Sequence, residues 1–293
     1  MSSKSYRKYA QILGIRLNST SRKGVITFVK YRIEKKSKFY IVTPNPEIIL
    51  ASKSDRALFK ALNAADFSLP DGIGLAQASR FLFLKVPRNI ILRLLLSFFQ
   101  GLLVGAATFF RKDWLTSSLN VLPGRKVFLD LISEANKNSW KVFLLGGESG
   151  IAAKTGEKLA KRYKKIRFGF FDGPKLNKNG SPDREVDILI QKRCVEKINE
   201  LKPQLLFIAL GPTKQEKWIF KNISRLEVGG AMVVGGTFNY IAGASKLPPK
   251  WLESLGLEWA WRLISEPWRF GRILNAFPVF PLKVFWYKVK NND

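Results

Sequence analysis

The sequence predicts an α/β protein with a mostly parallel sheet and helices on both of its faces. Short apolar segments alternate with segments of helical periodicity along most of the 293 residues. The apolar segments lack the strict alternation of half-buried strands, which indicates that they are buried on both faces. Most are followed by a polar or glycine-rich loop that leads into a helix, as in sheets built from strand–helix units.

The elements follow in chain order. Apolar residues recur at helical spacing over 25–33, behind a cap at Ser19 or Thr20, and predict the first helix. By the same periodicity, further helices are expected at 47–65, 72–83, 127–138, 151–163, 183–201 and 214–223. Short apolar runs between them predict strands at 39–43, 67–69, 141–145, 166–171, 204–210 and 231–234.

The amino-acid composition limits the partners and the catalytic groups that this protein can have. Fifty Lys and Arg against 22 Asp and Glu give a net charge of +28, which implies an anionic partner: nucleic acid, an acidic membrane surface or a phosphorylated substrate. A single cysteine, Cys194, excludes an internal disulfide and a multi-thiolate metal site. The absence of histidine excludes Ser-His, Cys-His and His-metal chemistry, so acid–base work must use carboxylates, Lys or Tyr.

The N-terminal segment 1–23 is basic and polar without an apolar core, so no signal peptide is expected and the protein is placed in the cytoplasm. Two familiar phosphate motifs are incomplete. The segment 147–155 has Ala153 where a P-loop needs glycine, and Gly72 and Gly74 lack the third glycine of a dinucleotide fingerprint. The chain also lacks the Asp-x-Asp pair that would hold a metal against a sugar nucleotide.

Loops at the carboxyl ends of the predicted strands would form a ligand cleft, since parallel sheets bind ligands at that edge. Glycines such as Gly72, Gly146 and Gly211 permit close backbone approach, although any α/β domain needs glycines in such turns. Asp71 lies between a strand and a helix, where it could serve as a general base or as a helix cap.

Other polar residues of these loops have two interpretations each. Thr43 and Asn45 end a neighbouring strand and could contact substrate or form turn hydrogen bonds. Gln215 could donate to a sugar or a diphosphate, and Lys214 could supply positive charge or be simply solvated.

Four separated motifs occur in a fixed order. They are Thr43-Pro-Asn45, the loop from Leu69 to Gly74 around Asp71, the segment from Gly211 to Glu216, and a tail with Glu258-Trp-Ala-Trp-Arg262 and Glu266-Pro-Trp-Arg269-Phe-Gly-Arg272. In these motifs the chain resembles the WecB/TagA/CpsF family of bacterial glycosyltransferases, from about residue 12 to 287.

The resemblance implies a Rossmann-like sugar-nucleotide domain at 1–245, with an apolar insertion at about 86–123, and a helical membrane-associating appendage at 246–293. It implies an inverting, metal-independent transfer of N-acetylmannosamine or its uronic acid from UDP to N-acetylglucosamine on undecaprenyl diphosphate. No cofactor is expected. Asp71 would be the base, and Arg262, Arg269 and Arg272 would hold diphosphate oxygens.

The chain departs from the family pattern at the expected substrate rim. Asn120 and Lys126 replace an arginine and an acidic residue around Gly124, and Phe238-Asn239 stands where Phe-Asp is common. The stretch that begins with Lys246 replaces Arg-Ala-Pro. These changes affect the prediction of the donor sugar more than the prediction of the reaction.

Two non-enzymatic interpretations compete: a basic nucleic-acid-binding protein and a catalytically inactive membrane scaffold. No nucleic-acid module is recognisable, and five tryptophans lie among Lys and Arg near the end of the chain, which favours an anionic lipid surface. A cytoplasmic, peripheral location on the inner face of the plasma membrane follows, with no nucleic-acid partner. A homo-oligomer is left open.

The uncharged run 94–110 is the most apolar part of the chain. A crossing there would separate Asp71 from Gln215, and the run is flanked on both sides by basic residues, so an interfacial or re-entrant helix is expected. Core or oligomer contact is the second interpretation, and a membrane span is the third.

Overall fold

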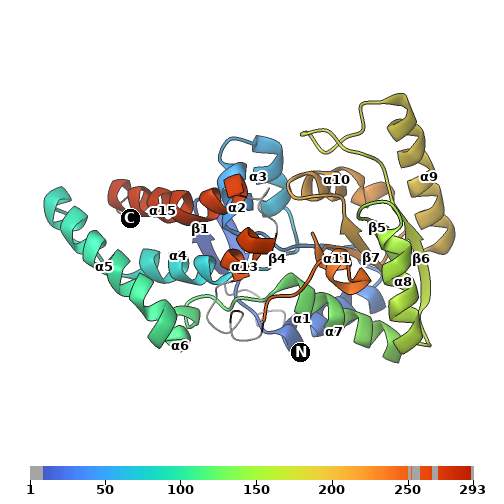
Figure 1. Cartoon of the computed structure of the whole chain (residues 1–293), viewed down its shortest axis with the longest axis horizontal. Helices are drawn as coiled ribbons and strands as arrows, with labels where there is room; N and C mark the ends of the chain where they lie inside the picture. The colour runs from blue at the N-terminus through green and yellow to red at the C-terminus, as the bar shows by residue number, and fades with distance from the viewer. Residues whose placement is uncertain (1–8, 250–251, 253–257, 266–269, 292–293) are drawn as a thin grey trace.

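The computed structural model describes residues 9–249, 252, 258–265 and 270–291. At its centre is a six-stranded parallel sheet in the order β4-β3-β8-β7-β5-β6 (Figure 1). Its strands are β3 (Tyr40–Val42), β4 (Phe67–Ser68), β5 (Lys141–Gly146), β6 (Arg167–Phe171), β7 (Leu205–Ala209) and β8 (Gly230–Val233). All six predicted strands are present, so the prediction of a parallel α/β fold is confirmed.

Helices cover both faces of this sheet, each over its own hydrophobic core. One core is built with α1 (Arg22–Glu34), α7 (Gly124–Lys137), α8 (Ile151–Arg162) and α11 (Thr237–Ala242). The other is built with α2 (Pro46–Ser52), α3 (Arg56–Asn63), α4 (Ile73–Phe83), α9 (Glu185–Leu201) and α10 (Lys214–Asn222). Strands β5, β7 and β8 are buried at nearly every residue because both of their faces are covered.

The predicted helix at 47–65 is wrong in its extent, since the structure divides it into α2 and α3. The Asp55 side chain accepts from the Leu58 amide at 2.9 Å and so caps a new helix within the predicted one. The cap of α1 is also one residue later than expected. Ser21 accepts from the Gly24 amide at 3.1 Å, in place of Ser19 or Thr20.

A short antiparallel hairpin precedes the sheet and was not predicted. Its strands are β1 (Tyr9–Ile12) and β2 (Ile15–Asn18). The hairpin contributes Ile12, Ile15 and Leu17 to the core, and the Asn18 side chain accepts from the Ser68 amide at 2.9 Å. The hairpin therefore supports β4, the strand that leads to Asp71.

Three helices extend from one end of the sheet, on the opposite side of the molecule from α8 and α9 (Figure 1). We call α4, α5 (Ile90–Phe110) and α15 (Phe280–Lys290) the helical lobe. The rings of Phe81 and Phe285 stack with centroids 6.2 Å apart, which joins α4 to α15. Arg93 of α5 donates to the Val289 carbonyl of α15 at 3.0 Å, so the last helix of the expected appendage also packs on the expected insertion at 86–123. The boundary near 245 stays a prediction.

The remaining elements are short. They are α6 (Lys112–Thr116), η2 (Ile223–Arg225), α13 (Glu258–Ser265), α14 (Phe270–Leu274) and the π-helical turn η4 (Asn275–Val279). Among the described residues, α5 alone is long and apolar enough to cross a membrane by length and composition.

Candidate active site

The carboxyl ends of the six strands meet at one edge of the sheet, where the expected loops lie together. The helices that follow β5 and β7 leave this edge toward opposite faces, because α8 packs in one core and α10 in the other. Such a divergence between neighbouring strands opens a crevice, the usual place for a ligand in this architecture. The helices that follow β3 and β8 diverge in the same way, so the structure places a candidate site along the carboxyl edge of the sheet from β3 to β5.

Gly146 and Gly147 follow β5 at this edge and lie against the end of β7. The Gly147 amide donates to the Ala209 carbonyl at 2.8 Å. Gly146 has a φ of 97°, and a Cβ there would lie 2.6 Å from the same carbonyl oxygen. Only glycine fits this position. Its close approach is to β7, which is a structural reason for this glycine that needs no ligand.

The backbone amide at the end of this loop is bound by a carboxylate. The Gly150 amide, at the start of α8, lies 3.2 and 3.1 Å from the two carboxylate oxygens of Asp172. Amides at helix N-termini are suited to phosphate oxygens. In the structure Asp172, from another of the loops expected at this edge, already accepts from the Gly150 amide.

Thr43 lies at the end of β3 in a tightly packed position. Its Oγ1 donates to the Val233 carbonyl at 3.4 Å, and only 9% of the residue is exposed. A Cβ at Gly124 would lie 3.1 Å from Thr43 Cγ2. The absence of a side chain at Gly124 therefore leaves the room that the Thr43 side chain fills.

Asn45 serves as the N-cap of α2. Its side-chain oxygen accepts from the Ile48 amide at 2.9 Å, so one side of its amide is used within the protein. This is the turn-forming role that the sequence offered as an alternative. The Asn45 NH₂ group remains the part that would serve a substrate.

Asp71 follows β4 and lies beside the loop that carries Thr43 and Asn45. The Asp71 backbone amide donates to the Pro44 carbonyl at 3.0 Å, and the residue is half-buried. Gly72 then takes a φ of 99° and leads into α4 with no side-chain cap. The structure thus brings Thr43, Asn45 and Asp71 together from two neighbouring strands, as the sequence predicted.

Gln215 and Glu216 are buried at the start of α10, with 2% and 0% of their surfaces exposed. Gln215 Nε2 donates to Glu216 Oε1 at 3.0 Å, while Gln215 Oε1 and Glu216 Oε2 have no hydrogen-bond partner. Burial raises the pKa of Glu216 to about 7, against the opposing effect of the Gln215 hydrogen bond. A large fraction of the Glu216 carboxyl group is therefore neutral near physiological pH.

The ammonium group of Lys214 has a hydrogen-bond partner within the protein. Its Nζ donates to the Leu176 carbonyl at 2.6 Å, in the loop between β6 and α9. Lys214 is the first of three lysines, with Lys217 and Lys221, that lie on one side of α10. Their spacing of three and four residues is a sequence signal for a shared helix face.

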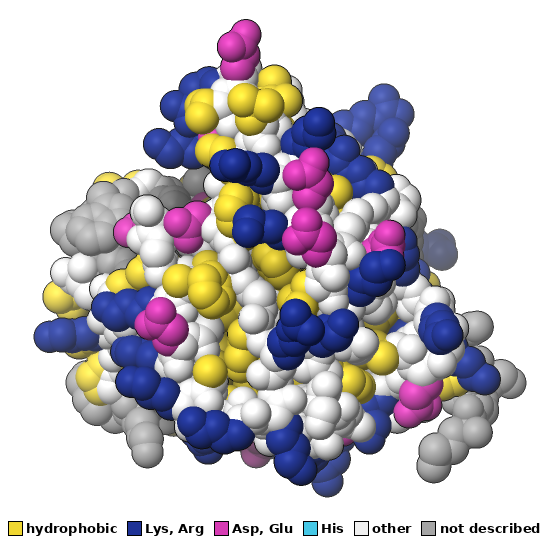
Figure 2. Space-filling model, turned by 90° about the vertical axis from the view of Figure 1, so that its right-hand side faces the viewer, with side chains coloured by type: hydrophobic (Ala, Val, Ile, Leu, Met, Phe, Trp, Pro, Cys, Tyr) yellow, Lys and Arg dark blue, Asp and Glu magenta, His cyan; other side chains and the backbone are white. Residues whose placement is uncertain are grey.

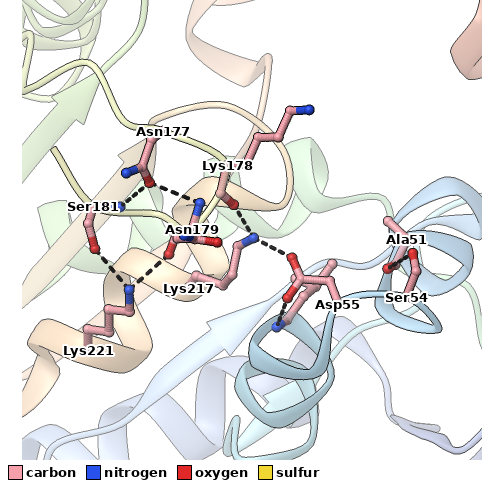
Figure 3. Close-up of polar contacts among 10 residues, drawn as sticks. Ala51, Ser54, Asp55, Asn177, Lys178, Asn179, Ser181, Lys217 and Lys221 are labelled. Carbon is pink, nitrogen blue, oxygen red and sulfur yellow. Dashed lines mark hydrogen bonds and ion pairs between the residues drawn. The ribbon is translucent and has the colours of Figure 1, made fainter. Parts of the chain in front are cut away.

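Figure 3 shows how the other two lysines hold the same loop. Lys217 Nζ donates to the Lys178 carbonyl and to the Asp55 carboxylate, and Lys221 Nζ donates to the Asn179 carbonyl at 2.9 Å. Lys217 is 1% exposed. Sequence reasoning missed Lys217, which fixes a loop at the site edge of the sheet to the start of α3.

The predicted arginines cannot be placed. Arg269 and the side chains of Arg262 and Arg272 lie outside the described residues. Within the part of the chain that the structure describes, no three side chains of His, Cys, Asp or Glu are grouped to hold a metal ion. Metal independence stays a prediction.

Fold and site together define an α/β protein whose parallel sheet carries polar loops, with the carboxylate of Asp71 among them, at its carboxyl edge. The model of the glycosyl transferase WecG/TagA/CpsF family matches residues 10–102 and 102–293. The chain belongs to this family, and it is a glycosyltransferase.

Curated relatives agree with this assignment. The N-acetylglucosaminyldiphosphoundecaprenol N-acetyl-beta-D-mannosaminyltransferase of Bacillus subtilis (strain 168) is 28% identical over 271 residues, which cover 92% of this chain and 87% of the relative. The enzyme of the same description from Staphylococcus aureus (strain MW2) is 26% identical over 275 residues, 93% and 91% of the two chains.

Proposed function

We propose that this glycosyltransferase moves N-acetylmannosamine, or a close relative of that sugar, from UDP to an N-acetylglucosamine carried on a polyprenyl diphosphate. The relatives named above act on N-acetylglucosaminyldiphosphoundecaprenol as N-acetylmannosaminyltransferases. The observation that carries the proposal is the placement of Asp71 next to the Thr43 loop, at the ligand edge of the sheet.

The proposed reaction is a single displacement. An acceptor hydroxyl oxygen bonds to the anomeric carbon while the bond from that carbon to the UDP oxygen breaks, and its electron pair leaves with UDP. The hydroxyl proton passes to the carboxylate of Asp71, which acts as general base. Attack opposite to the leaving group inverts the configuration at the anomeric carbon.

Other residues of the site would bind and orient the substrates. Gln215 would donate from the start of α10, and the hydroxyl of Thr43 would face the acceptor from the end of β3. The leaving UDP needs compensation of its negative charge when no metal is bound. Arg262, Arg269 and Arg272 would supply it through bidentate contacts with diphosphate oxygens.

The lipid-linked acceptor implies that the enzyme works at the inner face of the plasma membrane. The protein has an excess of positive charge, and Figure 2 shows Lys and Arg spread over one whole face with Asp and Glu among them. On that face the positive charge is not gathered into a stripe of the kind that tracks a nucleic-acid backbone.

The test is an assay of the purified full chain with UDP-N-acetylmannosamine, its uronic acid, UDP-N-acetylglucosamine and UDP-glucose, against a short-chain polyprenyl-diphosphate-N-acetylglucosamine. We expect transfer from one of the mannosamine donors, also in the presence of a chelator, with a product of inverted configuration. Transfer only from a different nucleotide sugar would show that the relatives' substrate does not extend to this chain.

A further inference from the structure

Helix α5 has its polar residues inside and its apolar residues outside. The positions turned toward the protein include Arg93, Ser97 and Thr108, which are at most 7% exposed. Twelve large apolar side chains of the same helix are exposed: Ile90, Ile91, Leu92, Leu94, Leu95, Leu96, Phe98, Phe99, Leu102, Leu103, Phe109 and Phe110. A helix on the surface of a water-soluble protein shows the reverse pattern.

The first inward contacts lie at the start of α5. Arg93 donates from Nε to the Pro87 carbonyl at 3.1 Å and from Nη1 to the Val289 carbonyl of α15 at 3.0 Å. The guanidinium group thereby joins α5 to the last helix of the chain.

Further inward contacts follow along α5. Gln100 Oε1 accepts from the buried Lys288 Nζ at 2.6 Å, and Gln100 Nε2 donates to the Lys85 carbonyl at 2.9 Å. Thr108 Oγ1 accepts from Gln77 of α4. The polar groups thus fix the orientation of α5 in the helical lobe, and the apolar side cannot turn inward without breaking them.

An apolar surface of this size is unusual in water. The largest exposed patch of a typical monomeric protein covers about 300–600 Å² and is often a binding site. Helices with polar residues inside and apolar residues outside are typical of proteins in contact with lipid, where the buried polar groups pair with one another. The pattern on α5 therefore favours a lipid bilayer as the occupant of this surface.

Charge determines the orientation of the helix on that surface. Exposed basic residues flank both ends of α5, with Lys85 and Arg88 before it and Arg111 after it. No charged residue lies in 94–110. We propose that α5 lies in the plane of an anionic membrane, with its apolar side in the acyl boundary and its basic ends among the headgroups. A spanning helix would have to place one basic end on the far side.

This orientation would fix the distance of the active site from the membrane surface. Helix α4 begins at Ile73, two residues after Asp71, and its Gln77 bonds to Thr108 of α5. The carboxylate is then connected to the membrane-bound helix by one continuous helix. Only this step depends on the proposed function: it would hold Asp71 near the level at which a lipid-linked diphosphate emerges.

The first test is vesicle co-sedimentation of a variant with Leu95, Phe99 and Leu102 all changed to Ser. These positions lie on one exposed side of α5. With vesicles of phosphatidylglycerol and phosphatidylcholine in equal parts, we expect binding to weaken by roughly tenfold or more, since each buried CH₂ contributes about 0.8 kcal/mol. Turnover with a water-soluble acceptor analogue should stay near the wild-type value.

The matched control changes Val186 and Leu189 of α9 to Ser. These apolar residues are equally exposed, at 54% and 64%, but lie away from the lobe. They should leave vesicle binding unchanged. Unchanged binding of the α5 variant, or a loss of self-association in place of a loss of vesicle binding, would overturn the proposal. Vesicle binding is measured without substrate, so a wrong assignment of the reaction would not affect it.

A second measurement distinguishes an α5 helix that lies in the membrane plane from one that spans the membrane, and it needs only one substitution. Phe99 is close to the middle of α5, and the single native cysteine, Cys194, is 0% exposed. Phe99→Cys therefore allows a fluorophore to be attached at one place. We expect stronger quenching by nitroxides near the headgroups than by nitroxides at the bilayer centre. Quenching that is strongest at the centre would show a span and overturn the in-plane arrangement.

Discussion

The ammonium group of Lys217 bonds to the carboxylate of Asp55, two residues that are 162 positions apart in the chain. The pair joins α10 to the cap of α3, and the same ammonium group also holds the Lys178 carbonyl of the β6–α9 loop (Figure 3). One buried side chain thus connects three segments beside the site edge of the sheet. Its chief role in this structure is to hold those three segments in place relative to one another.

Lys217→Met is expected to lower the free energy of unfolding by about 1–3 kcal/mol, because the Lys178 carbonyl and the Asp55 carboxylate lose their donor. Removal of one partner from a fully buried ion pair costs about 3–5 kcal/mol, but the Asp55 side chain is 32% exposed and water would replace part of the loss. Urea denaturation measures the difference. The exposed neighbour Lys221→Met is the control, and it should change stability by no more than about 0.5 kcal/mol.

The effect of Lys217→Met should also depend on pH. Burial acts to raise the pKa of Asp55, but the hydrogen bonds from Lys217 and from the Leu58 amide outweigh it and lower the pKa below 3.8. A carboxylate with a lowered pKa stabilises the folded state above its unfolded pKa and loses that contribution as the pH falls. The stability difference between wild type and variant should therefore shrink at acid pH. A constant difference would show that the ion pair contributes nothing.

Gly146→Ala should destabilise the protein by about 3 kcal/mol or more. The new Cβ would meet the Ala209 carbonyl oxygen at 2.6 Å, and the φ of 97° adds strain of its own. Gly211→Ala is the matched control, since its φ is 86° but no atom lies within 4 Å of its Cβ. We expect a loss of about 1–2 kcal/mol there, from strain alone. Equal losses in calorimetry would contradict the close approach of β5 and β7.

Glu216→Gln tests the buried carboxyl group of α10. Because burial raises its folded pKa from 4.5 to about 7, wild-type stability should fall as the pH rises between these values, since the folded state holds a proton that the unfolded state has lost. The Gln variant resembles the protonated form and should lack this decline. Its stability relative to wild type should thus increase from pH 4.5 to about 7 and then level off.

Denaturation midpoints over a pH series measure this effect. The exposed Glu157→Gln of α8 is the control, and its curve should run parallel to that of the wild type. Parallel curves for both variants would show that Glu216 is ionised throughout, with a partner that the folded protein provides in solution.

Most of the fold was accessible from the sequence because parallel strands buried on both faces leave an unbroken apolar signal, as in Val142–Leu145 and Leu205–Ala209. The boundary between α2 and α3 was missed, since the apolar periodicity continues on both sides of Asp55 and places this residue on the exposed helix side, although Asp favours caps. The β1–β2 hairpin was missed because its strands contain polar residues such as Gln11 and Arg16, and so lack the unbroken apolar run of the sheet strands.

The candidate site was predicted in part for a related reason. Residues that directly follow a strand, such as Thr43 and Asp71, are placed by the topology, and their neighbourhood was predicted correctly. The partners of side chains such as Lys214 and Lys217 depend on how a distant loop folds back, and no local pattern specifies that. The sequence therefore gave Lys214 a choice between solvent and ligand, while the structure adds the Leu176 carbonyl.

Asp71→Asn is the sharpest test of the proposed chemistry. The amide has nearly the same shape as the carboxylate but cannot accept the acceptor's proton, so turnover should fall by about 10²–10⁴-fold while UDP-sugar binding persists. The backbone bond from the Asp71 amide to the Pro44 carbonyl does not involve the carboxylate and is retained in this variant. Turnover and calorimetric titration with UDP are measured on the same preparation, with Asp66→Asn as the control at a distance from the site. Asp66 pairs with Arg32 beyond the opposite end of β4, so its variant should lose stability and keep its turnover per folded molecule. Wild-type turnover of Asp71→Asn across a pH series would assign Asp71 to the structure of the loop and leave the reaction without its base.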